Sequence, residues 1–165
     1  MKIICIVVFF LLVICSTSQA QELSKQNKLY VKLYAEKYIS KDPYWQKALE
    51  AILQVESQNG RYKIGKLDPS YGISQMKTST ARDCAKQIGL SIPESEEELK
   101  NLLIADDRLA IQLASVYLGY LFKKTNDVRL TLIAYNMGIN KMIETLRASS
   151  SLDEIYYNKI IEEIK

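Results

Sequence analysis

Helical spacing of apolar residues recurs along nearly the whole chain and restricts its fold more than any other feature. It is clearest over residues 106–124, where one set of positions is apolar or tyrosine: Leu109, Leu113, Val116, Tyr117, Tyr120 and Leu121. Residues three or four positions apart lie on one face of a helix, and an apolar helix face packs against a core. No strand-rich region or internal repeat appears. The sequence therefore predicts a domain that is all-α or nearly so.

Further helices are expected along the rest of the chain, over residues 24–40, 42–56, 78–89, 95–104, 128–136, 139–148 and from 151 onward. Capping residues indicate several of the starts. Asp42-Pro43 supplies an N-cap followed by a proline in the first turn. Ser95-Glu96-Glu97-Glu98 has the capping-box spacing, and Ser151-Leu152-Asp153-Glu154 is expected to cap the last helix.

Two segments depart from the amphipathic pattern. Residues 128–136 are apolar nearly all round, which predicts a helix at the centre of the domain. Residues 57–77 carry Gly60, Gly65 and the turn pair Asp68-Pro69. We expect an irregular loop there, with at most a short β excursion.

The first 20 residues form a separate unit. An unbroken apolar run over 3–14 follows the N-terminal lysine, and small or polar residues come next. A run this short, with Ser18 and Ala20 set for an A-x-A-like cut, is typical of a secretory signal peptide rather than a transmembrane helix. We therefore expect a signal peptide over 1–20, one domain over 21–165, and an exported protein in the periplasm or at the cell wall. An uncleaved N-terminal anchor is the alternative.

Composition narrows the chemistry. The 165 residues are 48% hydrophobic and 25% charged, which suits one globular domain with a real core. A net charge of only +3, without a lysine or arginine block, argues against nucleic acid as a partner. The chain has no histidine, which excludes a Ser-His-Asp triad, a Cys-His pair and an imidazole zinc site. Only Cys84 follows the signal peptide, and its helical context predicts a core residue.

Glu56 occupies a position that disfavours a charged carboxylate. At helical spacing it continues the apolar stripe of Leu49, Ile52 and Leu53, and it lies in the last turn before the expected helix stop at 59–60. Burial and the negative end of a helix both oppose ionisation of a carboxyl group. With no histidine in the chain, Glu56 is the leading candidate for proton transfer.

Three short motifs lie at the ends of predicted helices: VES at 55–57, GISQM at 72–76 and AYNMG at 134–138. In this order they make the chain resemble the soluble lytic transglycosylase (SLT) family, whose domain has a lysozyme-like, goose-type fold. The resemblance covers nearly all of the chain after the signal peptide. It includes the long segment 106–136 and YYNKI at 156–160, which is similar to the tyrosine-bearing terminal helix of that family.

The resemblance implies roles for five residues. Glu56 is the single catalytic acid, and Gln75 contacts the glycan. Tyr135 and Asn136 lie beside Glu56, and Tyr135 is expected to hydrogen-bond its carboxyl group. Ser74 stands where methionine is usual and is expected to form part of the wall of the sugar groove. The amides of glutamine and asparagine both donate and accept hydrogen bonds, as sugar recognition requires.

The resemblance also implies the reaction. The substrate is peptidoglycan, cleaved at the β-1,4 bond between N-acetylmuramic acid and N-acetylglucosamine. Glu56 protonates the leaving oxygen and then takes a proton from the 6-hydroxyl of muramic acid, which closes into a 1,6-anhydro end. Such a donor must be protonated near neutral pH, which an apolar site favours. Neither a metal nor a cofactor is expected.

Two other functions remain open. A muramidase that uses water needs a second carboxylate, for which Asp68 is the candidate. The other interpretation of Asp68 is the acid of an Asp-Pro turn. A non-catalytic peptidoglycan-binding assembly factor of the same fold has no need to keep Glu56. We expect a monomer and, by analogy with compact members of the family, a secretion, conjugation or motility apparatus as a partner.

Overall fold

The computed structural model describes residues 21–65, 69–148 and 151–165, and within these ranges the chain forms eight helices and no sheet. The helices are α1 (Lys25–Tyr38), α2 (Pro43–Ser57), α3 (Thr78–Gln87), α4 (Glu96–Ala105), α5 (Asp107–Thr125), α6 (Val128–Met137), α7 (Ile139–Arg147) and α8 (Ile155–Ile164). The predicted all-α class is confirmed, and the predicted helices agree with these bounds to within a few residues. The exception is the start of α8.

Side chains cap the N-termini of most helices. Asp42 accepts a hydrogen bond from the backbone N–H of Tyr44 at 2.9 Å, and Ser95 accepts one from Glu98 at 3.4 Å. Asp106 caps α5 in the same way. Each such cap stabilises a helix by about 1 kcal/mol because it satisfies a backbone donor that the helix leaves unpaired.

The predicted start of the last helix was wrong. Helix α8 begins at Ile155, and Ser151 lies outside it. The carboxylate of Asp153 accepts a hydrogen bond from the backbone N–H of Ile155 at 2.9 Å, and Glu154 pairs with Arg129 of α6. These contacts favour a turn at 153–155 and delay the helix beyond the capping-box position.

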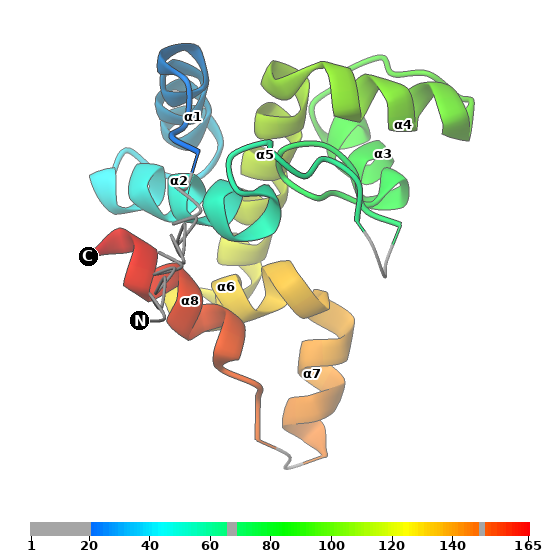
Figure 1. Ribbon diagram of the computed structural model, residues 1–165. Coiled ribbons are helices and arrows are strands. Elements are labelled where there is room, and N and C mark those ends of the chain that lie inside the picture. The colour runs from blue at the N-terminus through cyan, green and yellow to red at the C-terminus, as the bar shows by residue number, and fades with distance from the viewer. Residues whose placement is uncertain (1–20, 66–68, 149–150) are drawn as a thin grey trace, which may run out of the picture.

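Helix α5 runs through the centre of the domain (Figure 1) and packs against α1, α3, α4 and α6. Gly119 allows α5 to approach the end of α1 closely, because a Cβ atom there would lie 2.1 Å from the backbone oxygen of Tyr38. The prediction that residues 128–136 form the central helix was wrong. Helix α6 packs against α5, α7 and α8 and buries Leu132 against residues of α2, α5 and α8, but Asn136 is exposed at its end.

The segment between α2 and α3 is the predicted irregular excursion. Its described residues contain two isolated β-bridges, Ile64 to Tyr71 and Tyr71 to Met76. Gly72 has a φ of 78°, and a Cβ atom there would lie 2.3 Å from the backbone oxygen of Leu103, so only glycine fits. The predicted Asp68 falls outside the described residues.

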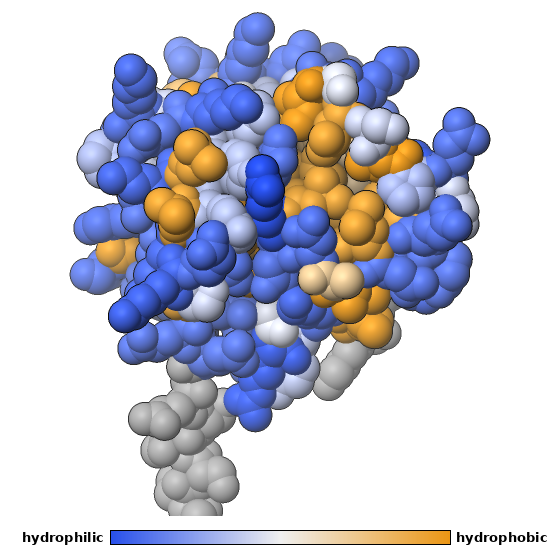
Figure 2. All heavy atoms as spheres, turned by 90° about the horizontal axis from the view of Figure 1, so that it is seen from above, coloured by the Kyte–Doolittle hydropathy of each residue, from blue (hydrophilic) through white to orange (hydrophobic). Residues whose placement is uncertain are grey.

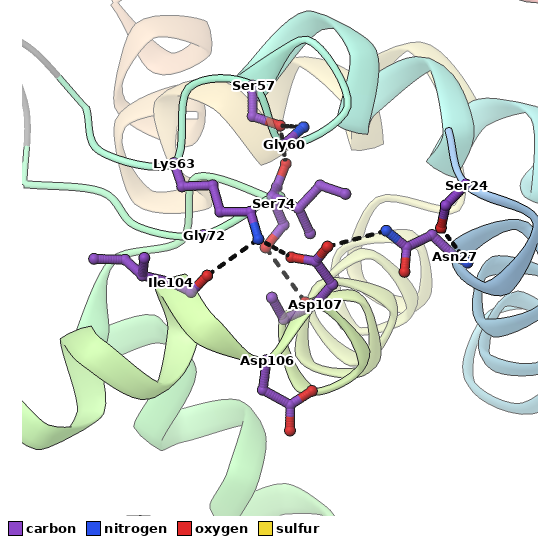
Figure 3. A network of polar contacts seen from close by, with 12 residues as sticks. Ser24, Asn27, Ser57, Gly60, Lys63, Gly72, Ser74, Ile104, Asp106 and Asp107 are labelled. Carbon is purple, nitrogen blue, oxygen red and sulfur yellow. Dashed lines mark hydrogen bonds and ion pairs between the residues drawn. The ribbon is translucent and has the colours of Figure 1, made fainter. Parts of the chain in front are cut away.

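A network of polar contacts ties this loop to the helices around it (Figure 3). Lys63 Nζ lies 2.6 Å from Asp107 Oδ1 and 3.1 Å from the backbone oxygen of Ile104. Asn27 of α1 donates to the other oxygen of Asp107 at 3.0 Å. The loop is therefore held against the junction of α4 and α5, which fixes the position of the residues that follow it.

The surface is mainly hydrophilic when seen from above, and hydrophobic side chains gather chiefly on the side of α3 and α4 (Figure 2). Of the helices described, none has both the length and the apolar character needed to cross a membrane.

Cys84 is buried, which confirms its prediction as a core residue. Burial, and to a smaller extent the charge of Asp83, raises the pKa of its thiol to about 12. The expected signal peptide over 1–20 lies outside the described residues.

Candidate active site

Glu56 lies in the last turn of α2, at a pocket of about 280 Å³. The helix ends at Ser57 because Gln58 and Asn59 both adopt left-handed backbone conformations, with φ values of 51° and 56°. The pocket walls come from α2, the loop before α3, and helices α3, α5 and α6. Residues that line it include Glu56, Gln75, Thr80, Tyr117, Tyr135 and Asn136.

Burial raises the pKa of Glu56 from 4.5 to about 7. A hydrogen bond from the hydroxyl of Tyr156 to Glu56 Oε1, 2.6 Å long, acts in the opposite direction by stabilising the carboxylate. The loss of hydration outweighs this bond, so a large fraction of Glu56 carries a proton at neutral pH. The carboxyl group can therefore donate a proton and, once ionised, recover it.

The tyrosine that holds Glu56 differs from the predicted one. Tyr156 of α8 donates to Glu56, whereas the hydroxyl of Tyr135 donates to the backbone oxygen of Ser74 at 3.3 Å. Burial and the neighbouring charge of Glu56 raise the pKa of both phenols well above the ordinary value, so both remain donors. The motif YYNKI contained the signal for Tyr156, but spacing along the chain could not show which tyrosine faces Glu56 across 100 residues.

Gln75 lines the pocket, and the surrounding loop holds its side chain. Its backbone is left-handed, with a φ of 47°. Its amide nitrogen donates to the backbone oxygen of Gly72 at 2.9 Å, and its amide oxygen accepts from the hydroxyl of Ser70 at 3.1 Å. These contacts fix the position of the amide in the wall of the pocket.

Asn136 is one of the exposed residues that line the pocket. It lies in the last turn of α6, next to Tyr135, and lines the pocket that holds Glu56. The structure therefore brings Glu56, Gln75, Tyr135 and Asn136 to one pocket, although they come from three separate motifs.

Ser74 is a correction. Its side chain is fully buried and donates to the backbone oxygen of Ala110 at 3.3 Å, so it lies behind the pocket wall rather than in it. The reason is that the chain turns inward at this point. Ile73 is equally buried, and its backbone oxygen accepts a 2.6 Å hydrogen bond from the hydroxyl of Ser57.

The acidic groups of the described residues do not suggest a metal centre. Glu56 is the one carboxylate among the described residues that line its pocket. Nowhere in the described ranges do three or more histidine, cysteine, aspartate or glutamate side chains come together in a way that could hold a metal ion.

An all-α domain with a single, readily protonated carboxyl group in a pocket lined by amides and tyrosines has the features of a lysozyme-like domain. Residues 33–158 match the family model described as Transglycosylase SLT domain. The chain belongs to this family, and its fold is the lysozyme-like all-α fold of the SLT domain. A comparison with curated proteins gives no match. The family is one of peptidoglycan lytic transglycosylases, which implies peptidoglycan as the substrate.

Proposed function

We propose that the protein is a lytic transglycosylase that cleaves the β-1,4 bond between N-acetylmuramic acid and N-acetylglucosamine and leaves 1,6-anhydromuramic ends. The observation that carries this proposal is the environment of Glu56. Burial raises its pKa to about 7, and Tyr156 holds its carboxyl group in place. Membership of the SLT family supplies the class of substrate.

The reaction needs one group that serves as an acid and then as a base. Protonated Glu56 donates its proton to the glycosidic oxygen as the bond from that oxygen to C1 of muramic acid breaks, and the N-acetylglucosamine unit leaves with a free hydroxyl group. The carboxylate of Glu56 then takes the proton of the muramic 6-hydroxyl while that oxygen forms a bond to C1. Glu56 ends the cycle protonated, and no water is consumed.

A pKa near neutrality suits both steps. A carboxyl group with an ordinary pKa of 4.5 would be almost entirely ionised at pH 7 and could seldom donate, whereas one with a pKa of about 7 is present in both forms. Tyr156 is a positioning residue in this scheme, because its hydroxyl fixes the orientation of the carboxyl group. It also stabilises the carboxylate during the interval between the two proton transfers.

Gln75 and Asn136 are proposed to bind the sugar substituents. Both side chains line the pocket that holds Glu56. The amide of Asn136 offers both a donor and an acceptor to acetamido and hydroxyl groups. The amide nitrogen of Gln75 already donates to the backbone oxygens of Gly72 and Tyr62, so its amide oxygen is the group that can accept from a sugar. Because the loop holds the amide of Gln75, this side chain loses little conformational freedom when a glycan binds.

A transglycosylase of this kind needs only the one carboxylate that the described pocket supplies. Hydrolytic glycosidases pair two carboxyl groups that lie roughly 5 to 9.5 Å apart. Among the described residues that line the pocket, Glu56 has no such companion. A water-using muramidase with Asp68 as its second acid would produce reducing ends instead of anhydro ends.

The direct test is digestion of purified sacculi by the wild-type protein and by Glu56→Gln. The wild type should solubilise the sacculi and release fragments that borohydride cannot label, because anhydro ends have no reducing group. Glu56→Gln should abolish lysis. Glu50→Gln is the matched control, because Glu50 lies on the same helix but its carboxylate accepts a hydrogen bond from Gln46 away from the pocket. Lysis that survives Glu56→Gln would overturn the role of Glu56 as the proton donor, and a wild type without lytic activity would support a non-catalytic assembly factor.

We also propose that the protein is exported and acts in the periplasm or at the cell wall, where its substrate lies. The proposal is supported by the apolar run over 3–14 and the small residues up to Ala20. N-terminal sequencing of the protein recovered from the envelope should begin at Gln21. A chain that still begins at Met1 would indicate an N-terminal anchor instead.

A further inference from the structure

A second cavity adjoins the pocket that holds Glu56. It has a volume of about 290 Å³ and lies between α6, α7 and α8, with Lys141 contributed by α7 and Lys159 by α8. Asn136 and Met137 line both cavities, so the two openings meet at the end of α6. Tyr156, which donates to Glu56, also forms part of the wall of the second cavity. A ligand there would lie against the tyrosine that holds the carboxyl group of Glu56.

The second cavity is positively charged. Lys141 and Lys159 are both exposed, and neither forms an ion pair with a described residue. The one acidic residue of the lining, Asp153, already accepts a hydrogen bond from the backbone at the start of α8. The lining therefore carries two positive charges and one negative charge, and the negative group already accepts a hydrogen bond. This net positive charge favours an anionic ligand.

One wall of the cavity is apolar. Ile155 is 62% exposed, the largest exposed fraction among the large hydrophobic side chains of the described residues. Met137 lies at the boundary with the first pocket. A ligand that suits this cavity combines small apolar groups with a carboxylate within reach of the two lysines.

We propose that this cavity binds the carboxylate-bearing substituent at C3 of the muramic acid ring, through Lys141 and Lys159. This inference rests on the proposed function. The substituent is a lactyl ether, whose methyl group suits Ile155, and it continues into a peptide stem that bears free carboxylates. C3 belongs to the ring whose C1 is attacked at Glu56, so its substituent has to leave the pocket through an opening that adjoins the catalytic group. The cavity beyond Asn136 is such an opening.

Two sources of the carboxylate are distinguishable. In an intact strand the lactyl group is linked to the peptide, and the free carboxylates belong to the stem. In a strand from which an amidase has removed the stems, the lactyl group itself ends in a carboxylate. The lysines thus select muramic acid over N-acetylglucosamine at this position, and the two substrates show which carboxylate they contact.

The activity test compares the double variant Lys141→Gln, Lys159→Gln with the wild type on intact and on amidase-treated strands. Exposed ion pairs contribute modestly, so we expect kcat/KM to fall roughly three- to tenfold, mainly through an increase in KM. A fall on intact strands alone identifies the stem carboxylates, a fall on amidase-treated strands alone identifies the lactyl carboxylate, and a fall on both shows that the lysines accept either. An unchanged kcat/KM on both substrates would overturn the inference. The matched control is Lys25→Gln, Lys32→Gln, which removes the same charge from the exposed face of α1.

A binding test separates this inference from the proposed function. Glu56→Gln, with and without the two cavity substitutions, is titrated with muramyl dipeptide, N-acetylmuramic acid and N-acetylglucosamine while amide NMR shifts are followed. Binding of a muramyl ligand should perturb residues around Asn136 and should weaken roughly three- to tenfold when the lysines are replaced or when salt screens them. Equal affinity with and without the lysines, or equal affinity for the three sugars, would overturn the inference even if the wild type is lytic.

Discussion

Replacing Glu56 by glutamine should stabilise the folded protein, and the gain should depend on pH. The folded state raises the pKa of Glu56 from 4.5 to about 7, so it binds the proton of this group more tightly than the unfolded chain does. The contribution of Glu56 to the free energy of unfolding is fully present below the unfolded pKa of 4.5, and it is lost as the pH rises through the folded pKa of about 7. Above that range the ionised carboxylate is a cost to folding that glutamine does not carry.

The magnitude follows from the size of the pKa shift. A shift from 4.5 to about 7 corresponds to about 3 kcal/mol of lost stability at about pH 8, and to less than about 1 kcal/mol at about pH 5. The hydroxyl of Tyr156 can still donate to the amide oxygen of glutamine, so the substitution removes the charge and retains the hydrogen bond. Glu56→Gln should therefore gain about 2 kcal/mol more stability at the higher pH.

Urea unfolding at the two pH values, followed by circular dichroism, measures this difference. The slope of the unfolding free energy against urea concentration should be the same for both proteins, which allows their unfolding free energies to be compared directly. Glu50→Gln on the same helix controls for the removal of one negative charge. An equal effect of Glu56→Gln at both pH values would show that burial does not shift the titration of Glu56, and the reasoning about its proton would fail.

Three other substitutions test neighbouring features. Tyr156→Phe removes the bond that lowers the pKa of Glu56, so the alkaline limb of the pH–rate profile should move to higher pH while kcat falls about tenfold. An unmoved profile would remove Tyr156 from its positioning role. Gly119→Ala should destabilise the protein by at least about 2 kcal/mol in urea, because its Cβ would overlap the oxygen of Tyr38. Lys63→Met should cost about 2 kcal/mol and accelerate amide exchange in the loop before α3, whereas unchanged exchange there would show that the ion pair does not hold the loop.

Most of the fold could be predicted from the sequence because its signals are local. Apolar residues at helical spacing indicated the helices, and Asp42, Ser95 and Asp106 mark starts that their side chains cap. The centre of the domain was predicted wrongly. Residues 128–136 are apolar nearly all round because α7 and α8 cover faces that α5 does not. Hydrophobicity alone does not show which neighbouring helices cover those faces.

The candidate site was likewise predictable from the sequence only in part. The unfavourable position of Glu56 at the end of an apolar stripe was visible locally, and its raised pKa agrees with the direction expected from burial. The partner of its carboxyl group was not visible, because Tyr156 and Glu56 meet only when α8 packs on α2. The same limit applies to Ser74, whose burial depends on a contact with α5 far along the chain. Side-chain direction within a turn is set by tertiary packing rather than by spacing.

The most direct test of the account is the source of the oxygen at the newly formed muramic ends. Sacculi are digested by the wild-type protein in water labelled with heavy oxygen, and the released fragments are analysed by mass spectrometry. We predict anhydromuramic ends without label, because the 6-hydroxyl of the same sugar closes the ring while Glu56 takes its proton. Reducing ends that carry the label would contradict the account and would identify a hydrolase.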